Sequence, residues 1–204
     1  MINEERIVRD LFAVGGSAGG LEALIEVVRR LPADLPATIG VVLHRSPTDS
    51  GYLASILSRA SSIPVSEPAD GEPVRPRHVY LAPRDFHLSI RDERWVLDRE
   101  PKQHRMRPAV DRLLISAAAA RGNRVVGLLL SGGGADGVEG LIAIKAKGGL
   151  SLVQQPGQAR QPSMPCSAIR EDDVDAALSV EDIARSLPLL AAGHAVGVGS
   201  SEAL

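Results

Sequence analysis

Three polar residues, each placed after an apolar run, are of the types that acyl transfer requires. Ser17 follows LFAV within GGSAG, His44 follows TIGVVL, and Asp136 comes after VVGLLL in the loop SGGGADG. A serine hydroxyl becomes a good nucleophile when an imidazole accepts its proton, and a carboxylate orients that imidazole and stabilises its cation. Because the carboxyl ends of parallel strands meet at one edge of a sheet, we expect these three side chains to share a site.

Each of the three residues also has a purely structural interpretation. Ser17 is suited to cap the helix that follows it, and Asp136 is suited to cap the helix after SGGGADG. His44, in LHRSP, has the alternative of an exposed loop histidine. The coincidence of three such residues after three separate strands favours catalysis. The surrounding glycines add free backbone N–H groups that can hold an oxyanion.

The glycine-rich stretch also has to be compared with nucleotide-binding loops. A dinucleotide fingerprint reads G-x-G-x-x-G, whereas the corresponding positions here are Gly15, Ser17 and Gly20. The next strand ends in His44-Arg45 and not in the acidic residue that holds a ribose, although Arg45 suits a 2′-phosphate and leaves NADP binding open. No GK[ST] follows the glycines, which excludes a Walker loop.

Chain order alone permits a second triad. Hydrolases with the α/β fold run Ser, then Asp, then a late His, which would combine Ser17 and Asp136 with His194. His194 lies in AAGHAVGVGS, which is typical of a terminal tail. His44 is therefore the preferred base.

Apolar strands alternate with helix-period segments along the chain, which predicts an α/β fold. The expected strands are 11–14, 38–43, 125–130 and 150–153, and the expected helices are 21–30, 51–60, 108–120, 138–147 and 180–191. Between 62 and 100 the pattern changes to short β segments, with a hairpin around RDER in which Trp95 packs. We predict a three-layer, doubly wound, mainly parallel sheet with this hairpin as an appendage, formed by residues 1–192 and followed by a flexible tail at 193–204.

Composition and charge are those of an ordinary globular protein. The 204 residues carry a net charge of −2, so the charge balance does not indicate nucleic acid as a partner. The start MINEERIVRD lacks the apolar segment of a signal peptide, and no apolar run approaches the roughly 18 residues of a membrane span. The single cysteine, Cys166, excludes a CxxC metal site and an internal disulfide, and we expect it in a loop or the core. We expect a cytoplasmic protein without membrane insertion.

Six motifs, in order, resemble the catalytic domain of the bacterial chemotaxis protein-glutamate methylesterase family, CheB. They are AVGGSAGGLEAL, VVLHRSP, DGEPVRPRHVYLAP, HRMRPAVDRLL, LLLSGGGADGVEGL and PSMPCSAI, and they span nearly the whole chain. The resemblance implies a triad of Ser17, His44 and Asp136. It also implies oxyanion donors at the backbone N–H groups of His44 and Gly133, and an active-site loop around Met164.

The sequence departs from the family's pattern at three positions and at its start. The family usually has Ser or Thr where this chain has Ala18, Met at Gly133 and often Asn at Ala135. Without the hydroxyl at Ala18 one orienting side chain is lost, and Gly133 makes its N–H less preorganised. The family's amino-terminal receiver domain does not precede the motif in this chain, so we expect no phosphorylation control in cis.

The resemblance implies hydrolysis of glutamyl methyl esters on chemoreceptors, with deamidation of receptor glutamines as a related activity and no metal or organic cofactor. The implied partners are methylated receptor cytoplasmic helices and a separate or fused methyltransferase or receiver protein. Because those helices are rich in carboxylates, Arg105 and Arg107 are candidates to line the substrate cleft, as are Ala18 and Met164. A solvated loop is the alternative for the two arginines.

Two further histidines, His87 and His104, are candidates for the edge of the cleft, with surface roles as the alternative. On the same fold, the alternative function is a catalytically weak signalling module or an NADP-type nucleotide-binding module.

Overall fold

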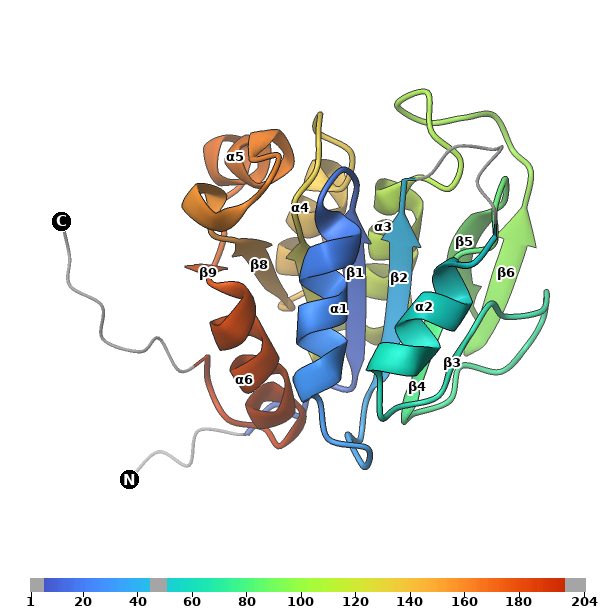
Figure 1. Ribbon diagram of the computed structural model, residues 1–204, viewed down its shortest axis with the longest axis horizontal. Helices are drawn as coiled ribbons and strands as arrows, with labels where there is room; N and C mark the ends of the chain where they lie inside the picture. The colour runs from blue at the N-terminus through green and yellow to red at the C-terminus, as the bar shows by residue number, and fades with distance from the viewer. Residues whose placement is uncertain (1–5, 45–50, 197–204) are drawn as a thin grey trace, which may run out of the picture.

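Seven short segments of the chain form one parallel sheet in the order β3-β4-β2-β1-β7-β8-β9 (Figure 1). The computed structural model describes residues 6–44 and 51–196. The strands are β1 (Leu11–Gly16), β2 (Thr38–Leu43), β3 (Val65–Ser66), β4 (His78–Leu81), β7 (Val125–Leu129), β8 (Leu150–Gln154) and β9 (Ala176–Leu178). Every pairing within this sheet is parallel, which confirms the predicted fold class.

Helices cover both faces of the sheet and make the three layers. They are α1 (Gly20–Arg30), α2 (Leu53–Ala60), α3 (Val110–Arg121), α4 (Val138–Ala146), α5 (Ser163–Glu171) and α6 (Val180–Ala191), with 3-10 turns η1 (Gly122–Arg124) and η2 (Pro156–Gln158). Figure 1 shows α1, α2 and α6 on one face and α3 and α4 on the other. Side chains of β1 alternate between the two cores, Phe12 towards the first and Leu11 towards the second. Burial on both faces explains why such strands are continuous apolar runs.

The predicted hairpin is present as β5 (His87–Arg91) and β6 (Arg94–Asp98), an antiparallel pair outside the main sheet. It is more than an appendage, because Trp95 is fully buried in the core on the α3 side. A Cβ at Gly40 of β2 would lie 2.9 Å from the Trp95 ring. The glycine therefore allows the indole to pack directly against the sheet.

Trp95→Ala is expected to lower the free energy of unfolding by about 3–5 kcal/mol, because it empties a large, fully enclosed site in the core. Urea denaturation followed by circular dichroism measures this change. Tyr52, whose side chain is exposed, is the matched control, and Tyr52→Ala is expected to change stability by less than about 0.5 kcal/mol. Equal effects of the two substitutions would contradict the packing described.

The main elements lie where the sequence predicts them, with small shifts at their ends and three additions. Helix α2 begins at Leu53 and α3 at Val110, later than predicted. Helix α5 and the short strands β3 and β9 were not predicted, and β4 joins the main sheet. The end of α6 at Ala191 agrees with the predicted helix, whereas residues 197–204 of the predicted tail lie outside the described residues.

In the part of the chain that the structure describes, no helix has the length and apolarity needed to cross a bilayer.

Candidate active site

The carboxyl ends of three adjacent strands bring together the side chains that the sequence singled out. Gly16 at the end of β1 is paired with Leu43 at the end of β2, so Ser17 and His44 follow neighbouring backbone positions. Asp136 comes from the loop after β7, the strand on the other side of β1. His44 Nε2 donates to Asp136 Oδ2 over 2.7 Å, with both side chains almost completely enclosed. The predicted contact between base and carboxylate is therefore present.

Asp136 is held at the amino terminus of α3. Its Oδ2 accepts from the backbone N–H of Val110 and its Oδ1 from that of Asp111, each over 2.9 Å. Both amides belong to the first turn of the helix, where N–H groups lack partners and the helix dipole favours an anion. The capping interpretation is thereby corrected: Asp136 caps α3, whereas α4 begins at Val138 with Gly137 as its N-cap and no side-chain cap bond.

Charge at this site is governed by two carboxyl groups. Burial opposes ionisation of Asp136, but hydrogen bonds from His44 and from the two α3 amides outweigh it and lower the pKa of that carboxyl. Its neighbour Asp111 is also buried, and burial, with the charge of Asp136 beside it, raises the pKa of Asp111 to about 6. Asp136 therefore ionises more readily than Asp111.

Ser17 lies in a tight turn between β1 and α1. Its N–H donates to the Ser131 carbonyl over 2.9 Å, and its carbonyl accepts from Gly20 over 2.8 Å. Helix α1 has Gly19 as its N-cap without a side-chain cap bond, which contradicts the capping interpretation of Ser17. Within the described residues the hydroxyl makes no hydrogen bond, so the bond to His44 is not formed here. Such bonds often tighten only when substrate binds.

The ring of His44 is oriented so that Nε2 serves the carboxylate. This leaves Nδ1 as the ring nitrogen that is not bound to the carboxylate. In serine proteases the nitrogen that contacts the aspartate is Nδ1, so the ring of His44 is turned the other way relative to its carboxylate.

Two backbone N–H groups near Ser17 have no hydrogen-bond partner among the described residues. The N–H groups of Ala18 and Gly133 make no hydrogen bond with any described residue, and the space beside Gly133 is open, with Gln161 Cγ 4.0 Å from where a Cβ would lie. The N–H of His44, the other implied donor, already donates to the Gly16 carbonyl over 3.0 Å as part of the β1–β2 ladder. The Ala18 position corresponds to the donor in α/β-hydrolases, in which the residue after the nucleophile contributes its N–H.

Comparison with known families agrees with this geometry. Residues 12–187 match the protein family described as CheB methylesterase. The chain belongs to the CheB methylesterase family. A curated relative from Oleidesulfovibrio alaskensis, "Protein-glutamate methylesterase/protein-glutamine glutaminase 1", is 34% identical over 184 residues, covering 88% of this chain and 50% of the relative. A relative of the same name from Xanthomonas campestris is 39% identical over 186 residues, covering 89% of this chain and 52% of the relative.

A solved structure of the family has the same fold. The CheB methylesterase catalytic domain of Thermotoga maritima superposes with a TM-score of 0.85 at 34% identity, covering 89% of this chain and 98% of that domain. The chain therefore spans about half the length of the curated relatives it matches, and nearly all of a solved CheB catalytic domain.

Sequence reasoning missed Ser131, a fully buried residue of this CheB-family site. Its Oγ donates to the Ala18 carbonyl over 2.7 Å and accepts from the Gln161 N–H over 2.9 Å. Its own N–H donates to Gln154 Oε1. It thereby ties the nucleophile turn to the segment before α5. The only signal in the sequence was a serine between a buried strand and three glycines.

Ser131→Ala is expected to lower the free energy of unfolding by about 1–3 kcal/mol, because the part-buried bonds to the Ala18 carbonyl and from the Gln161 N–H are lost. Thermal unfolding monitored by circular dichroism provides the measurement. Ser55, whose exposed hydroxyl bonds a carbonyl within its own helix turn, supplies the control variant Ser55→Ala. If both variants unfold like the parent protein, Ser131 is not the connection described.

Of the four residues expected in the substrate cleft, the structure leaves two exposed. They are Ala18, which directly follows Ser17, and Arg105, in the loop between β6 and α3. Met164 is completely buried, and a Cβ at Gly132 would lie 3.0 Å from both its sulfur and Ser17 Cβ. Met164 therefore supports the site from beneath and does not line a surface.

Arg107 is bound within the protein, which gives it a structural role beside its predicted place in the substrate cleft. Its guanidinium donates to the Asp85 carboxylate and to the carbonyls of Arg99 and Glu100. These bonds hold the loop between β6 and α3 in place.

The remaining candidates lie away from the reacting groups. His194 follows α6, and the Arg9 N–H donates to the Leu190 carbonyl, so this helix end lies where the chain enters β1, opposite the catalytic edge. This excludes the triad with His194. His87 is fully buried between the Pro101 carbonyl and the Ala109 N–H and is a structural residue. Cys166 is exposed on α5, neither in a loop nor in the core.

Proposed function

We propose that this chain is a protein-glutamate methylesterase that hydrolyses glutamyl methyl esters of chemoreceptors at Ser17. The observation that carries the proposal is the buried His44–Asp136 pair, whose side chains lie 2.7 Å apart. Ser17 follows the neighbouring strand, and its hydroxyl does not cap the helix α1. Family membership supports the ester as substrate, since both relatives described above are named for this activity.

The proposed first step is attack of Ser17 Oγ on the ester carbonyl. His44 Nδ1 accepts the hydroxyl proton, and Asp136 stabilises the resulting imidazolium. The negative oxygen of the tetrahedral intermediate binds the N–H groups of Ala18 and Gly133. As the intermediate collapses, the bond between its central carbon and the methoxy oxygen breaks, and methanol leaves with the proton from His44.

The second step releases the glutamate. Water adds to the acyl-enzyme carbonyl while His44 accepts its proton, and the same proton returns to Ser17 Oγ as the ester to the enzyme breaks. The relatives' second activity, protein-glutamine glutaminase, fits the same sequence of steps with ammonia as the first leaving group.

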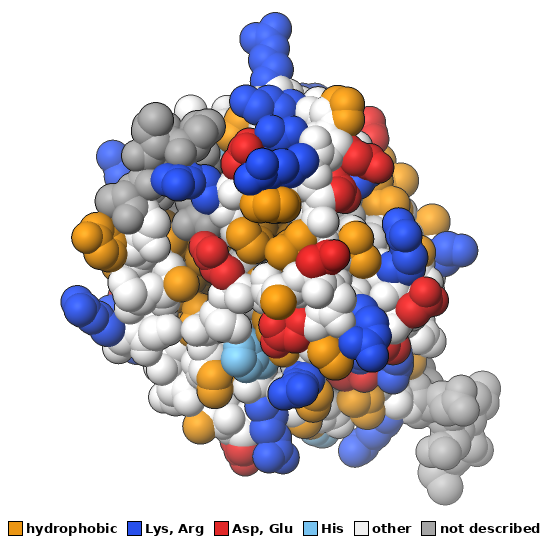
Figure 2. All heavy atoms as spheres, turned by 90° about the vertical axis from the view of Figure 1, so that its right-hand side faces the viewer, with side chains coloured by type: hydrophobic (Ala, Val, Ile, Leu, Met, Phe, Trp, Pro, Cys, Tyr) orange, Lys and Arg blue, Asp and Glu red, His pale blue; other side chains and the backbone are white. Residues whose placement is uncertain are grey.

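A basic edge beside the site supports an acidic receptor helix as partner. Figure 2 shows Lys and Arg side chains gathered at the top of the hairpin face, the edge at which the strands end. Lys102 and Arg105 are exposed in the loop between β6 and α3, and neither forms an ion pair within the described part of the chain. Positive charge free of internal partners favours binding of carboxylate-rich helices.

Release of methanol from a methyl-labelled receptor cytoplasmic fragment tests the proposal. We expect each methanol to be matched by one new glutamate in the receptor, and ammonia to appear when the fragment carries glutamine at these positions. The absence of release from two unrelated receptor fragments, with the protein shown to be folded, would contradict it. Saturable NADPH binding in that case would favour the nucleotide-binding alternative, whose candidate Arg45 lies outside the described residues.

A further inference from the structure

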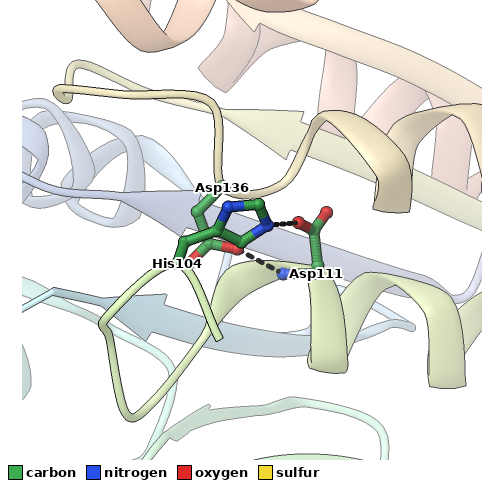
Figure 3. A group of neighbouring side chains, drawn as sticks. All are labelled: His104, Asp111 and Asp136. Carbon is green, nitrogen blue, oxygen red and sulfur yellow. Dashed lines mark hydrogen bonds and ion pairs between the residues drawn. The ribbon is translucent and has the colours of Figure 1, made fainter. Parts of the chain in front are cut away.

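A second histidine faces the carboxyl groups of the site from outside the triad. His104, in the loop between β6 and α3, has its Nε2 3.0 Å from Asp111 Oδ2. One ligand-type atom from each of His104, Asp111 and Asp136 lies within 4.8 Å of the other two. Figure 3 shows the imidazole lying across the two carboxyl groups. Three groups that bind metal ions therefore converge on one point beside His44.

One carboxylate oxygen in this cluster has no hydrogen bond. Asp111 is 2% exposed, and its Oδ1 accepts from the Gly140 N–H over 2.7 Å. Its Oδ2 is completely enclosed and accepts no hydrogen bond from the described residues, although it points at His104. A buried carboxylate oxygen normally has a donor or a cation. Its close partner is the His104 ring nitrogen, so a cation held between the two would supply the interaction that this oxygen lacks.

The Asp111 and Asp136 carboxyl groups also have few positively charged partners. Asp111 and Asp136 are both buried, and no lysine or arginine within residues 6–44 and 51–196 forms an ion pair with either. The only cationic partners they have there are His44 and His104. With His44 neutral, as a general base must be before reaction, at most one positive charge faces two carboxyl groups. A bound cation would relieve this imbalance.

We propose that His104, Asp111 and Asp136 form a binding site for a divalent cation of the zinc class. An imidazole nitrogen and carboxylate oxygens are both ligand types that zinc accepts, and three protein ligands leave the fourth, tetrahedral position to water. Calcium and magnesium prefer six or more oxygen ligands and are disfavoured by the nitrogen.

The geometry allows the site to close around an ion. Zinc bonds of about 2.0–2.2 Å require the ligand atoms to lie roughly 3.3 Å apart. His104 and Asp111 already satisfy this approximately at 3.0 Å. The His104 side chain is 42% exposed on a surface loop, whereas both carboxylates are buried. It can therefore meet the ion first and deliver it to the enclosed oxygens.

Occupation of the site would inhibit the triad, a consequence that rests on the proposed function. A cation on Asp136 takes charge from the carboxylate that anchors His44. It also places a divalent positive charge near the ring that must become an imidazolium when Ser17 reacts. The ion is thus an inhibitor that competes for the triad carboxylate, and takes no part in the reaction.

Isothermal titration of the whole chain with zinc chloride tests the site without reference to activity. We expect one zinc per chain in the parent protein and at least about a tenfold loss of affinity in His104→Asn, which removes a direct ligand. Asparagine suits the positive φ of 48° at His104, so the loop is preserved. His194→Asn, at an exposed histidine on the opposite edge of the sheet, is the matched control and should bind like the parent. Equal affinity in all three proteins, or no binding by the parent, would overturn the proposal.

Methanol release measured in the same three proteins tests inhibition. We expect zinc to inhibit the parent and His194→Asn at the concentrations that saturate the site, with recovery on chelation, and to inhibit His104→Asn only at tenfold or higher concentration. Site-specific binding without inhibition would overturn the inhibitory role. If no protein releases methanol even without zinc, the proposed methylesterase function fails, and the titration alone still decides whether the cation site exists.

Discussion

Replacing Ser17 with alanine is expected to lower kcat for methanol release by about 10⁶-fold, the loss found when a serine triad loses its nucleophile. The structure supports so large an effect because no other nucleophile stands beside His44 within the described residues: Ser131 is fully buried and bonded to the Ala18 carbonyl. The substitution is also mild for the fold, since the Ser17 hydroxyl caps no helix and makes no hydrogen bond there.

A second experiment labels the protein with a fluorophosphonate probe and detects the product by intact-protein mass spectrometry. The parent should gain the mass of one phosphonyl group at Ser17, and Ser17→Ala should gain none. Ser55→Ala, at an exposed serine, controls for the loss of a hydroxyl as such. Methanol release by Ser17→Ala within tenfold of the parent would mean that the reaction does not pass through this residue.

Replacing Asp136 with asparagine is expected to lower kcat by about 10⁴-fold while leaving the shape of the site nearly unchanged. The Asp136 carboxylate accepts from His44 and from two backbone amides, whereas an asparagine amide has one accepting oxygen and one donating nitrogen. The amide nitrogen of the asparagine must either face an N–H of α3, donor against donor, or point its own hydrogen at His44 Nε2. In the second case the imidazole is held in the tautomer that cannot accept the Ser17 proton.

The asparagine variant should also unfold more easily, by about 1–3 kcal/mol, because a donor meets a donor in an enclosed position. Measuring kcat well below the unfolding transition separates this loss from the chemical one. Asp34→Asn, at an exposed carboxylate, is the control and should leave both quantities unchanged. A variant of Asp136 that is less stable but fully active would show that the residue matters only to the fold.

The sheet was predictable because its strands are buried on both faces, which leaves continuous apolar runs such as TIGVVL in the sequence. Helix α5 was not, since SMPCSAIRE contains a proline and few large apolar residues, and it is stabilised by contacts of Met164 and Ala168 with the core. Strand β9 has three residues, too few for a period to emerge. The burial of Trp95 against Gly40 depends on two segments far apart in the chain, and neither shows it alone.

The same reasoning explains what could be foreseen of the site. Ser17, His44 and Asp136 each follow a strand, so their shared edge was a consequence of the parallel sheet. Asp111 was hidden, because an acidic residue in the first turn of a helix is ordinary. Its importance arises only when α3 is placed against the loop after β7, where the Asp111 N–H donates to Asp136. The engagement of the His44 N–H in the ladder likewise follows from strand register, which residue types do not reveal.

The two hydrogen bonds from the start of α3 to Asp136 determine which residue of the proposed site can be lost over evolutionary time while the protein still folds. Selection for a folded chain alone would retain the carboxylate, because α3 depends on it, but would place no such demand on the Ser17 hydroxyl. In a duplicated copy released from its enzymatic duty, the nucleophile is therefore the first of the two to drift. A descendant with an intact aspartate and no serine would keep the fold without the ability to form an acyl-enzyme at this position.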